Sequence, residues 1–107
     1  MADIFISYAR EDEARIRDLV HALEEQGWSI FWDRRIPAGK TWDSYIGQAL
    51  SEAKCVIVAW SNHSITSGWV KEEANDAKER GVLVPVFLES VKAPLGFRSI
   101  QAADLTA

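Results

Sequence analysis

Residues 55–60, Cys-Val-Ile-Val-Ala-Trp, are the stretch of the chain that most clearly indicates its fold. The run is short and almost wholly apolar, which is typical of a β-strand. It lacks the alternation of polar and apolar residues seen in a half-exposed strand, so we expect it to be buried on both faces. Cys55, at its start, is expected to be a buried structural thiol.

Helices and strands alternate on either side of this strand. Strands are predicted over residues 3–8, 28–32 and 82–88, and helices over residues 11–26, 42–53 and 69–80. Apolar residues recur at helical spacing in the helices, and Trp42 is expected to pack as an anchor where the second helix begins. This strict alternation predicts an α/β fold around a parallel sheet with right-handed crossovers.

The C-terminal part of the chain is less regular. Pro85 lies inside a predicted strand, which indicates an irregularity or a position at the sheet edge. A short fifth strand is expected within residues 101–105. No helix is predicted after residue 89, so we expect one domain over residues 1–107, trimmed at its C-terminus or excised from a larger protein.

Composition excludes several classes of protein. The chain has 107 residues, of which 48% are hydrophobic and 26% charged, as in ordinary globular domains. A net charge of -4 argues against a nucleic-acid partner, and a single cysteine argues against a disulfide framework or a cysteine-rich metal site. No apolar run is long enough to span a bilayer, and the N-terminus shows no signal peptide. We therefore expect a cytoplasmic protein without a membrane partner.

Two adjacent glutamates near residue 70 have different predicted environments. Trp69 and Glu73 are four residues apart, which places them side by side on a helix. At about 100° per residue, Glu73 falls on the shoulder of the apolar face that contains Val70 and Ala74, whereas Glu72 points to solvent. Glu73 is therefore expected to be a carboxylate held partly out of water beside an aromatic ring.

This pair leaves two interpretations open. Glu73 could form a structural salt bridge, with Arg10 or Lys40 as its partner, and Trp69 could be a core aromatic residue. Alternatively, a partly buried carboxylate at the edge of a sheet marks a functional site. Ligands of open parallel sheets bind outside the carboxyl ends of the strands, where the loops at Arg10 and at residues 61–64 are expected to meet.

Other motifs in these loops are weaker. His63 lies near Ser61 and Ser64, but the chain has no Gly-x-Ser-x-Gly nucleophile elbow, so a Ser/His nucleophile is not favoured. The sequence also has no glycine-rich phosphate loop of the common types. The polar loop over residues 33–41 is either a solvated connection or a binding loop.

Three segments together resemble a known family. Residues 3–8, Asp-Ile-Phe-Ile-Ser-Tyr, are similar to the opening strand of TIR domains, the Toll/interleukin-1 receptor/resistance protein module. Residues 31–33, Phe-Trp-Asp, and 37–42, Pro-Ala-Gly-Lys-Thr-Trp, are similar to the family's second strand and BB loop. Residues 64–73, which end in Trp-Val-Lys-Glu-Glu, resemble the segment that carries the catalytic glutamate of enzymatic members. The sequence is closer in style to bacterial, NAD-cleaving members than to animal adaptors.

The resemblance implies a flavodoxin-like fold with a parallel sheet of strand order 2-1-3-4-5. It also implies cleavage of the bond between nicotinamide and ribose in NAD+, giving nicotinamide plus ADP-ribose or a cyclic form. Glu73 would be the catalytic glutamate, and NAD+ would be a substrate, with no cofactor or metal. The positions that the resemblance assigns to substrate binding are Ala9, Arg10, Asp33, Pro37, Lys40 and Trp69.

The resemblance also implies a partner and an alternative function. TIR domains associate with one another, here through the BB loop of residues 33–42, and neighbouring subunits would complete the site. The alternative is a scaffold that works by TIR–TIR contact, with Glu73 a structural relic. In that case Arg34 and Arg35 would belong to an interaction surface.

Overall fold

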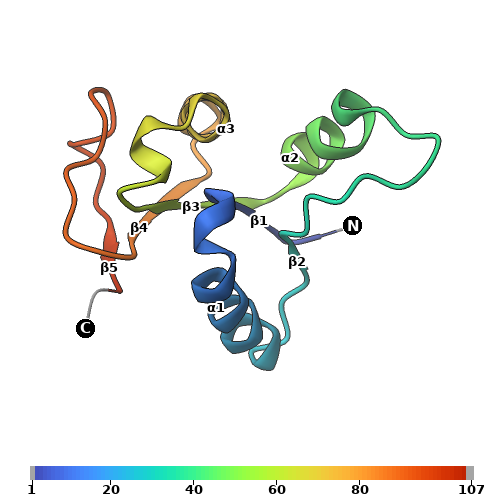
Figure 1. Cartoon of the computed structure of the whole chain (residues 1–107), viewed down its shortest axis with the longest axis horizontal. Coiled ribbons are helices and arrows are strands. Elements are labelled where there is room, and N and C mark those ends of the chain that lie inside the picture. Colours follow the sequence, from blue (N-terminus) through green and yellow to red (C-terminus); the bar gives the residue numbers. More distant parts are fainter. Residues whose placement is uncertain (1, 106–107) are drawn as a thin grey trace.

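The computed structural model describes residues 2–105, which form a parallel sheet between two layers of helices (Figure 1). The strands are β1 (Ile4–Ser7), β2 (Ile30–Phe31), β3 (Cys55–Trp60), β4 (Leu83–Phe87) and β5 (Ala103–Asp104). All neighbouring pairs are parallel, in the order β2-β1-β3-β4-β5. The predicted fold class and strand order are therefore confirmed.

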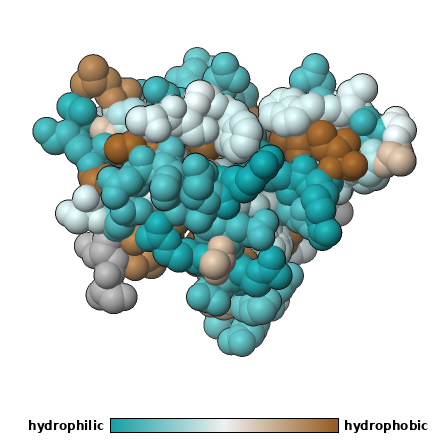
Figure 2. All heavy atoms as spheres, in the orientation of Figure 1, coloured by the Kyte–Doolittle hydropathy of each residue, from teal (hydrophilic) through white to brown (hydrophobic). Residues whose placement is uncertain are grey.

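The helices divide between the two faces of the sheet. The α-helices are α1 (Glu13–Glu25), α2 (Gln48–Glu52) and α3 (Gly68–Arg80); the short helical turns are η1 (Arg10–Asp12), η2 (Asp43–Gly47) and η3 (Ser64–Thr66). In Figure 1, α1 lies on one side of the sheet and α2 and α3 lie on the other. Hydrophilic residues cover the solvent side of α1 in the same view (Figure 2). Over residues 2–105, no helix is long and apolar enough to cross a bilayer.

Two apolar clusters fill the space between the layers. Successive residues of a strand point to opposite faces, so Phe5 belongs to the cluster under α2 and α3, whereas Ile4 and Ile6 belong to the cluster under α1. Residues 56–60 of β3 are buried along their whole length, as their apolar sequence predicts. Cys55 is only partly buried, so the prediction of a buried thiol is wrong for the first residue of the strand.

The second helix departs from its predicted form. Its first turn, Asp43–Gly47, has π-helical geometry, and regular α-helix begins only at Gln48. Ile46 is fully buried, but Trp42 is 46% exposed and does not pack as the predicted anchor. The wider π turn rotates Trp42 relative to the apolar residues that follow it, and the hydrophobic pattern did not reveal this.

Strand β4 tolerates Pro85 because the proline nitrogen, which cannot donate a hydrogen bond, faces away from β3. The carbonyl of Val82 accepts a hydrogen bond from Val56 and the amide of Leu88 donates to Trp60, so even-numbered residues at both ends of β4 bond to β3. Pro85, at the alternate position, turns its nitrogen away from β3. Pairing with β5 begins only at Val86, so Pro85 sits at a locally open edge, in agreement with its prediction.

Candidate functional site

Glu73 is fully enclosed, with 3% of its surface exposed, and both of its carboxylate oxygens are occupied. Ser7 Oγ donates a 2.6 Å hydrogen bond to Glu73 Oε1. Arg34 donates from Nη2 to the same oxygen at 2.9 Å and from Nη1 to Oε2 at 2.7 Å, which forms a bidentate ion pair. Glu72 is exposed, so the predicted difference between the two glutamates is correct and is larger than expected.

The partner of Glu73 is Arg34, and the predicted partners, Arg10 and Lys40, are both wrong. Because β2 lies beside β1, the loop that leaves β2 passes the carboxyl end of β1, and it brings Arg34 over Phe5. The guanidinium carbon lies 4.8 Å from the centre of the Phe5 ring and 5.7 Å from that of Tyr8. Nη2 also donates to the carbonyl of Ile6 at 3.0 Å.

A cavity of about 650 Å³ opens above Arg34, at the carboxyl end of β1. Its walls come from the segment after β1, which includes η1, and from α1, the loop after β2 and the start of α3. The lining residues are Tyr8, Arg10, Glu13, Arg17, Trp32, Asp33, Arg34, Arg35 and Trp69. Arginines outnumber carboxylates in this lining, which also contains three aromatic side chains. Glu73 is absent from the lining, and Arg34, which binds its carboxylate, is present.

Trp69 is a wall of the cavity. It is 43% exposed, so the interpretation as a core aromatic residue is wrong. Its Nε1 donates to the Tyr8 carbonyl at 3.4 Å, and the Tyr8 hydroxyl donates to the Trp32 carbonyl at 2.8 Å. Burial raises the pKa of the Tyr8 phenol, so this group remains a hydrogen-bond donor at neutral pH.

Four other charged groups of the cavity form two ion pairs. Arg35 binds the Asp33 carboxylate at 2.6 Å, and these hydrogen bonds lower the pKa of Asp33. Arg17 pairs with Glu13 at 3.3 Å and lies 5.4 Å from the centre of the Trp32 ring. All four groups are near solvent, where such pairs can exchange for a charged ligand at small cost.

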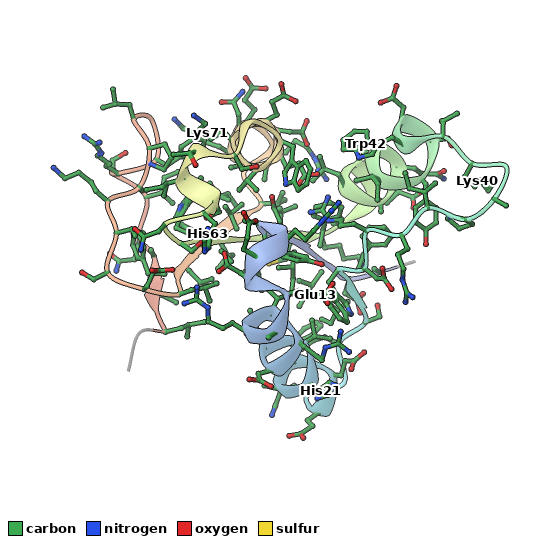
Figure 3. The ribbon with its side chains drawn as sticks, in the orientation of Figure 1. Glu13, His21, Lys40, Trp42, His63 and Lys71 are labelled. Atoms are coloured by element: carbon green, nitrogen blue, oxygen red, sulfur yellow. The ribbon has the colours of Figure 1, made fainter. Side chains whose placement is uncertain are left out.

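The residues predicted to bind substrate do not all meet in this cavity. Arg10, Asp33 and Trp69 line it. Ala9 is buried, and its carbonyl accepts a hydrogen bond from the Asp12 amide. The carbonyl of Pro37 accepts one from Lys40, and Lys40 lines a separate cavity of about 280 Å³. Figure 3 shows Lys40 at the outer end of its loop, away from Glu13.

The Ser/His group has no nucleophile geometry. Ser61 Oγ donates to the buried Asp12 carboxylate and accepts hydrogen bonds from the amides of His63 and Ser64. The His63 imidazole points elsewhere, with Nδ1 3.8 Å from Glu11 Oε2. These serines form a structural network that holds the loop after β3.

Sequence reasoning missed several residues that contact Glu73 or line the cavity. Alternation along β1 puts Ser7 on the same face as Phe5, beneath α3, and this pattern could have identified the Ser7–Glu73 contact. Tyr8 and Trp32 both follow strands that end at the same edge of the sheet. Arg34 had no comparable signal, because its position depends on the path of an irregular loop.

Comparisons with known proteins agree with this architecture. A sequence profile described as "TIR domain" matches residues 4–107. Over 73 residues, or 66% of the chain, the sequence is 40% identical to a protein of Brucella melitensis biotype 1 named probable 2′ cyclic ADP-D-ribose synthase TcpB, and 38% identical to the protein of that name in Brucella abortus. The chain spans 29% of the length of each of these relatives.

Solved structures of TIR domains have the same fold. The TIR domain of the Toll-related receptor TRR-2 from Hydra magnipapillata superimposes with a TM-score of 0.86 at 23% identity, covering 97% of this chain and 84% of that one. A TIR-STING receptor from C. gigas, in complex with 2′,3′-cGAMP, gives 0.80 at 28% identity, covering 98% and 35%. The TIR domains of the activated Roq1 resistosome give 0.68 at 29% identity, covering 81% and 57%.

Proposed function

The chain belongs to the TIR-domain family, and we propose that it cleaves the glycosidic bond between nicotinamide and ribose in NAD+. The products would be nicotinamide plus ADP-ribose or a cyclic ADP-ribose. The observation that carries this proposal is the buried Glu73 carboxylate beneath a cavity lined with arginines and aromatic rings.

The cavity suits a dinucleotide in size and in chemistry. At about 650 Å³ it is within the range of ordinary small-molecule sites. Trp32, Trp69 and Tyr8 provide flat surfaces against which a base or a nicotinamide ring can pack. Arg10 and Arg17 provide guanidinium groups that match phosphate oxygens. We assign substrate binding to the cavity residues Arg10, Asp33 and Trp69.

Glu73 would act on the ribose. Breaking the bond between C1′ and the nicotinamide nitrogen develops positive charge on the sugar, which a nearby carboxylate stabilises. The bonding electron pair leaves with the nicotinamide, which becomes neutral and needs no proton from a second acid. In hydrolysis, the oxygen of water then bonds to C1′ and its proton passes to solvent. One buried carboxylate is therefore sufficient for this chemistry.

The names of the relatives support a cyclic product, and the exposed BB loop supports a role for self-association. The Brucella proteins that match this chain are named for cyclic ADP-D-ribose synthesis. The BB loop over residues 33–42 carries Ile36 and Trp42, which are 38% and 46% exposed. We propose that these side chains contact a neighbouring TIR domain, so that activity rises more steeply than protein concentration.

The alternative function is a scaffold that acts through TIR–TIR contact alone. It is favoured by the ion pair with Arg34, which occupies both oxygens of Glu73 in this structure. A scaffold would use the exposed BB loop and would have no requirement for a free carboxylate. The two functions are distinguished by whether NAD+ is consumed.

The first test compares Glu73→Gln with Glu72→Gln in an NAD+ consumption assay at high protein concentration. Glu73→Gln keeps the size of the side chain and removes its charge, and we expect it to lower kcat by about 100-fold or more. Glu72→Gln makes the same chemical change one residue away, on the exposed side of α3, and should leave kcat unchanged. Equal loss in both variants, or activity retained by Glu73→Gln, contradicts the assignment.

A further inference from the structure

The side chain of Arg34 fills a defined slot at the floor of the cavity. One side of the slot is formed by the rings of Phe5 and Tyr8, with centres 4.8 and 5.7 Å from the guanidinium carbon. The end of the slot is formed by the Glu73 carboxylate and the Ile6 carbonyl, which together accept three hydrogen bonds from Arg34. The slot therefore offers aromatic faces, one negative charge and a neutral acceptor.

These features select a flat cation that carries N–H groups along one edge. Aromatic faces attract a cation that lies over them, and a carboxylate binds paired N–H donors in its plane. A guanidinium has this shape and charge. The cationic nicotinamide ring of NAD+ is also flat and positive, so it would lie over the same aromatic faces, with the ribose attached to it next to the Glu73 carboxylate.

Arg34 is an imperfect occupant of the slot. Its Nε is buried and has no hydrogen-bond partner among residues 2–105, which is costly for a donor removed from water. Its side chain is 22% exposed and it comes from a loop that has no helix or strand between β2 and η2. A ligand could therefore displace it by moving a loop residue, without disrupting a regular element.

The ion pair also opposes the proposed reaction. With Arg34 in place, the charge of Glu73 is already neutralised and both oxygens are used. The positive charge that develops on the ribose would then have no free Glu73 carboxylate to stabilise it. The guanidinium and the substrate cannot occupy the slot together.

We propose that the space between Phe5, Tyr8 and Glu73 is a binding slot for planar cations, and that Arg34 occupies it as an internal competitor of the substrate. The identity of the substrate rests on the proposed function; the slot itself rests on the contacts of Arg34. The occupied form is the resting state, and the enzyme works from the fraction of molecules in which Arg34 has left.

The kinetic test compares Arg34→Ala with Arg98→Ala. Removing the competitor should lower KM for NAD+ by about tenfold if the slot is free in about a tenth of wild-type molecules. Arg98, which donates to the Ala93 carbonyl in the segment after β4, is an arginine far from the cavity, and its replacement should leave KM unchanged. Methylguanidinium should restore inhibition in Arg34→Ala and compete with NAD+. An unchanged or higher KM in folded Arg34→Ala overturns the proposal.

A binding test separates the slot from the enzyme activity. Methylguanidinium, titrated by NMR, should bind Arg34→Ala, should not bind wild type, and should lose its binding in the double variant Arg34→Ala/Glu73→Gln. Arg34→Lys, which keeps the charge but cannot span both oxygens of Glu73, provides a second variant and should bind weakly. If methylguanidinium binds Arg34→Ala but neither wild type nor Arg34→Ala cleaves NAD+, the slot is supported and the proposed function is overturned. Failure of folded Arg34→Ala and Arg34→Lys to bind overturns the slot.

Discussion

Ser7 connects the first strand to the buried carboxylate at the scale of single residues. Its hydroxyl donates a 2.6 Å hydrogen bond to Glu73 Oε1, and both side chains are buried. Hydrogen bonds to charged groups contribute about 1.5–3 kcal/mol, so Ser7→Ala should lower the free energy of unfolding by about 2 kcal/mol. The measurement is urea unfolding at pH 7.

The matched control for Ser7 is Ser51, near the end of α2. Its hydroxyl donates to the Gln48 carbonyl at 3.0 Å in an exposed position, where water can replace the bond. Ser51→Ala should change the free energy of unfolding by less than about 0.5 kcal/mol. Equal effects of the two substitutions would show that the Ser7 bond to Glu73 has no special strength.

Helical phase was enough to distinguish Glu73 from Glu72 because it depends only on neighbouring residues of one helix. The depth of burial and the partner of Glu73 depend on segments far along the chain. Ser7 is 66 residues away and Arg34 is 39 residues away. The sequence therefore identified the less exposed carboxylate of the two but not the ion pair that it forms.

At the scale of helices and strands, Gly81 ends α3 in a conformation that other residues seldom adopt. Its φ is +73°, and its amide donates to the last turn of α3. A Cβ added there would meet nothing within 4 Å, so substitution costs only backbone strain. Gly81→Ala should lower the free energy of unfolding by about 1 kcal/mol.

Gly47→Ala is a control that should have the opposite effect on the free energy of unfolding. It lies in the helical region with φ -61° and ψ -39°, and an added Cβ would again meet nothing within 4 Å. Gly47→Ala should therefore stabilise the protein by about 0.5–1 kcal/mol, because alanine favours helix. Thermal or urea unfolding of both variants checks the pair; a loss of stability in Gly47→Ala would indicate that the π turn needs a glycine.

The helices and strands were predicted where an apolar pattern extended over several residues. Strand β3 and the helix α3 agree with their predicted ranges to within a residue. Strand β2 is shorter than predicted, because only Ile30–Phe31 pair with β1 and Trp28 is 52% exposed. Aromatic residues favoured a longer strand, but pairing depends on the neighbouring strand rather than on propensity.

At the scale of the whole molecule, the carboxyl ends of the strands concentrate positive charge that composition does not reveal. The chain has a net charge of -4, yet the cavity at this edge contains four arginines and two carboxylates. Strand order could be predicted from the family resemblance, and it brings the relevant loops together. The internal pairing of those charges, including the ion pair of Arg34, follows from loop paths that the sequence pattern does not specify.

The buried carboxylate of Asp12 connects three of the segments at the carboxyl edge of the sheet through hydrogen bonds. Asp12 is 1% exposed and lies in the segment after β1. It accepts hydrogen bonds from Ser61, in the loop after β3, and from Arg15 at 2.6 Å. Arg15 also binds Glu89, in the segment after β4, at 2.9 Å. The positions of α1 and of the segments after β3 and β4 therefore depend on Asp12.

Asp12→Ala should consequently be among the more damaging single substitutions outside the apolar core. It removes the carboxylate acceptor of the buried Ser61 hydroxyl, which keeps only a 3.5 Å contact with Ser64 Oγ, and it removes one partner of Arg15. We therefore expect the free energy of unfolding to fall by about 3 kcal/mol. The matched control is Glu11→Ala, because Glu11 is the exposed acidic residue next to it, and its effect should stay below about 0.5 kcal/mol. Urea unfolding measures both variants. A small loss in Asp12→Ala would mean that the loops at the carboxyl edge are held by their apolar contacts alone, and that the hydrogen-bonded network follows their positions without fixing them.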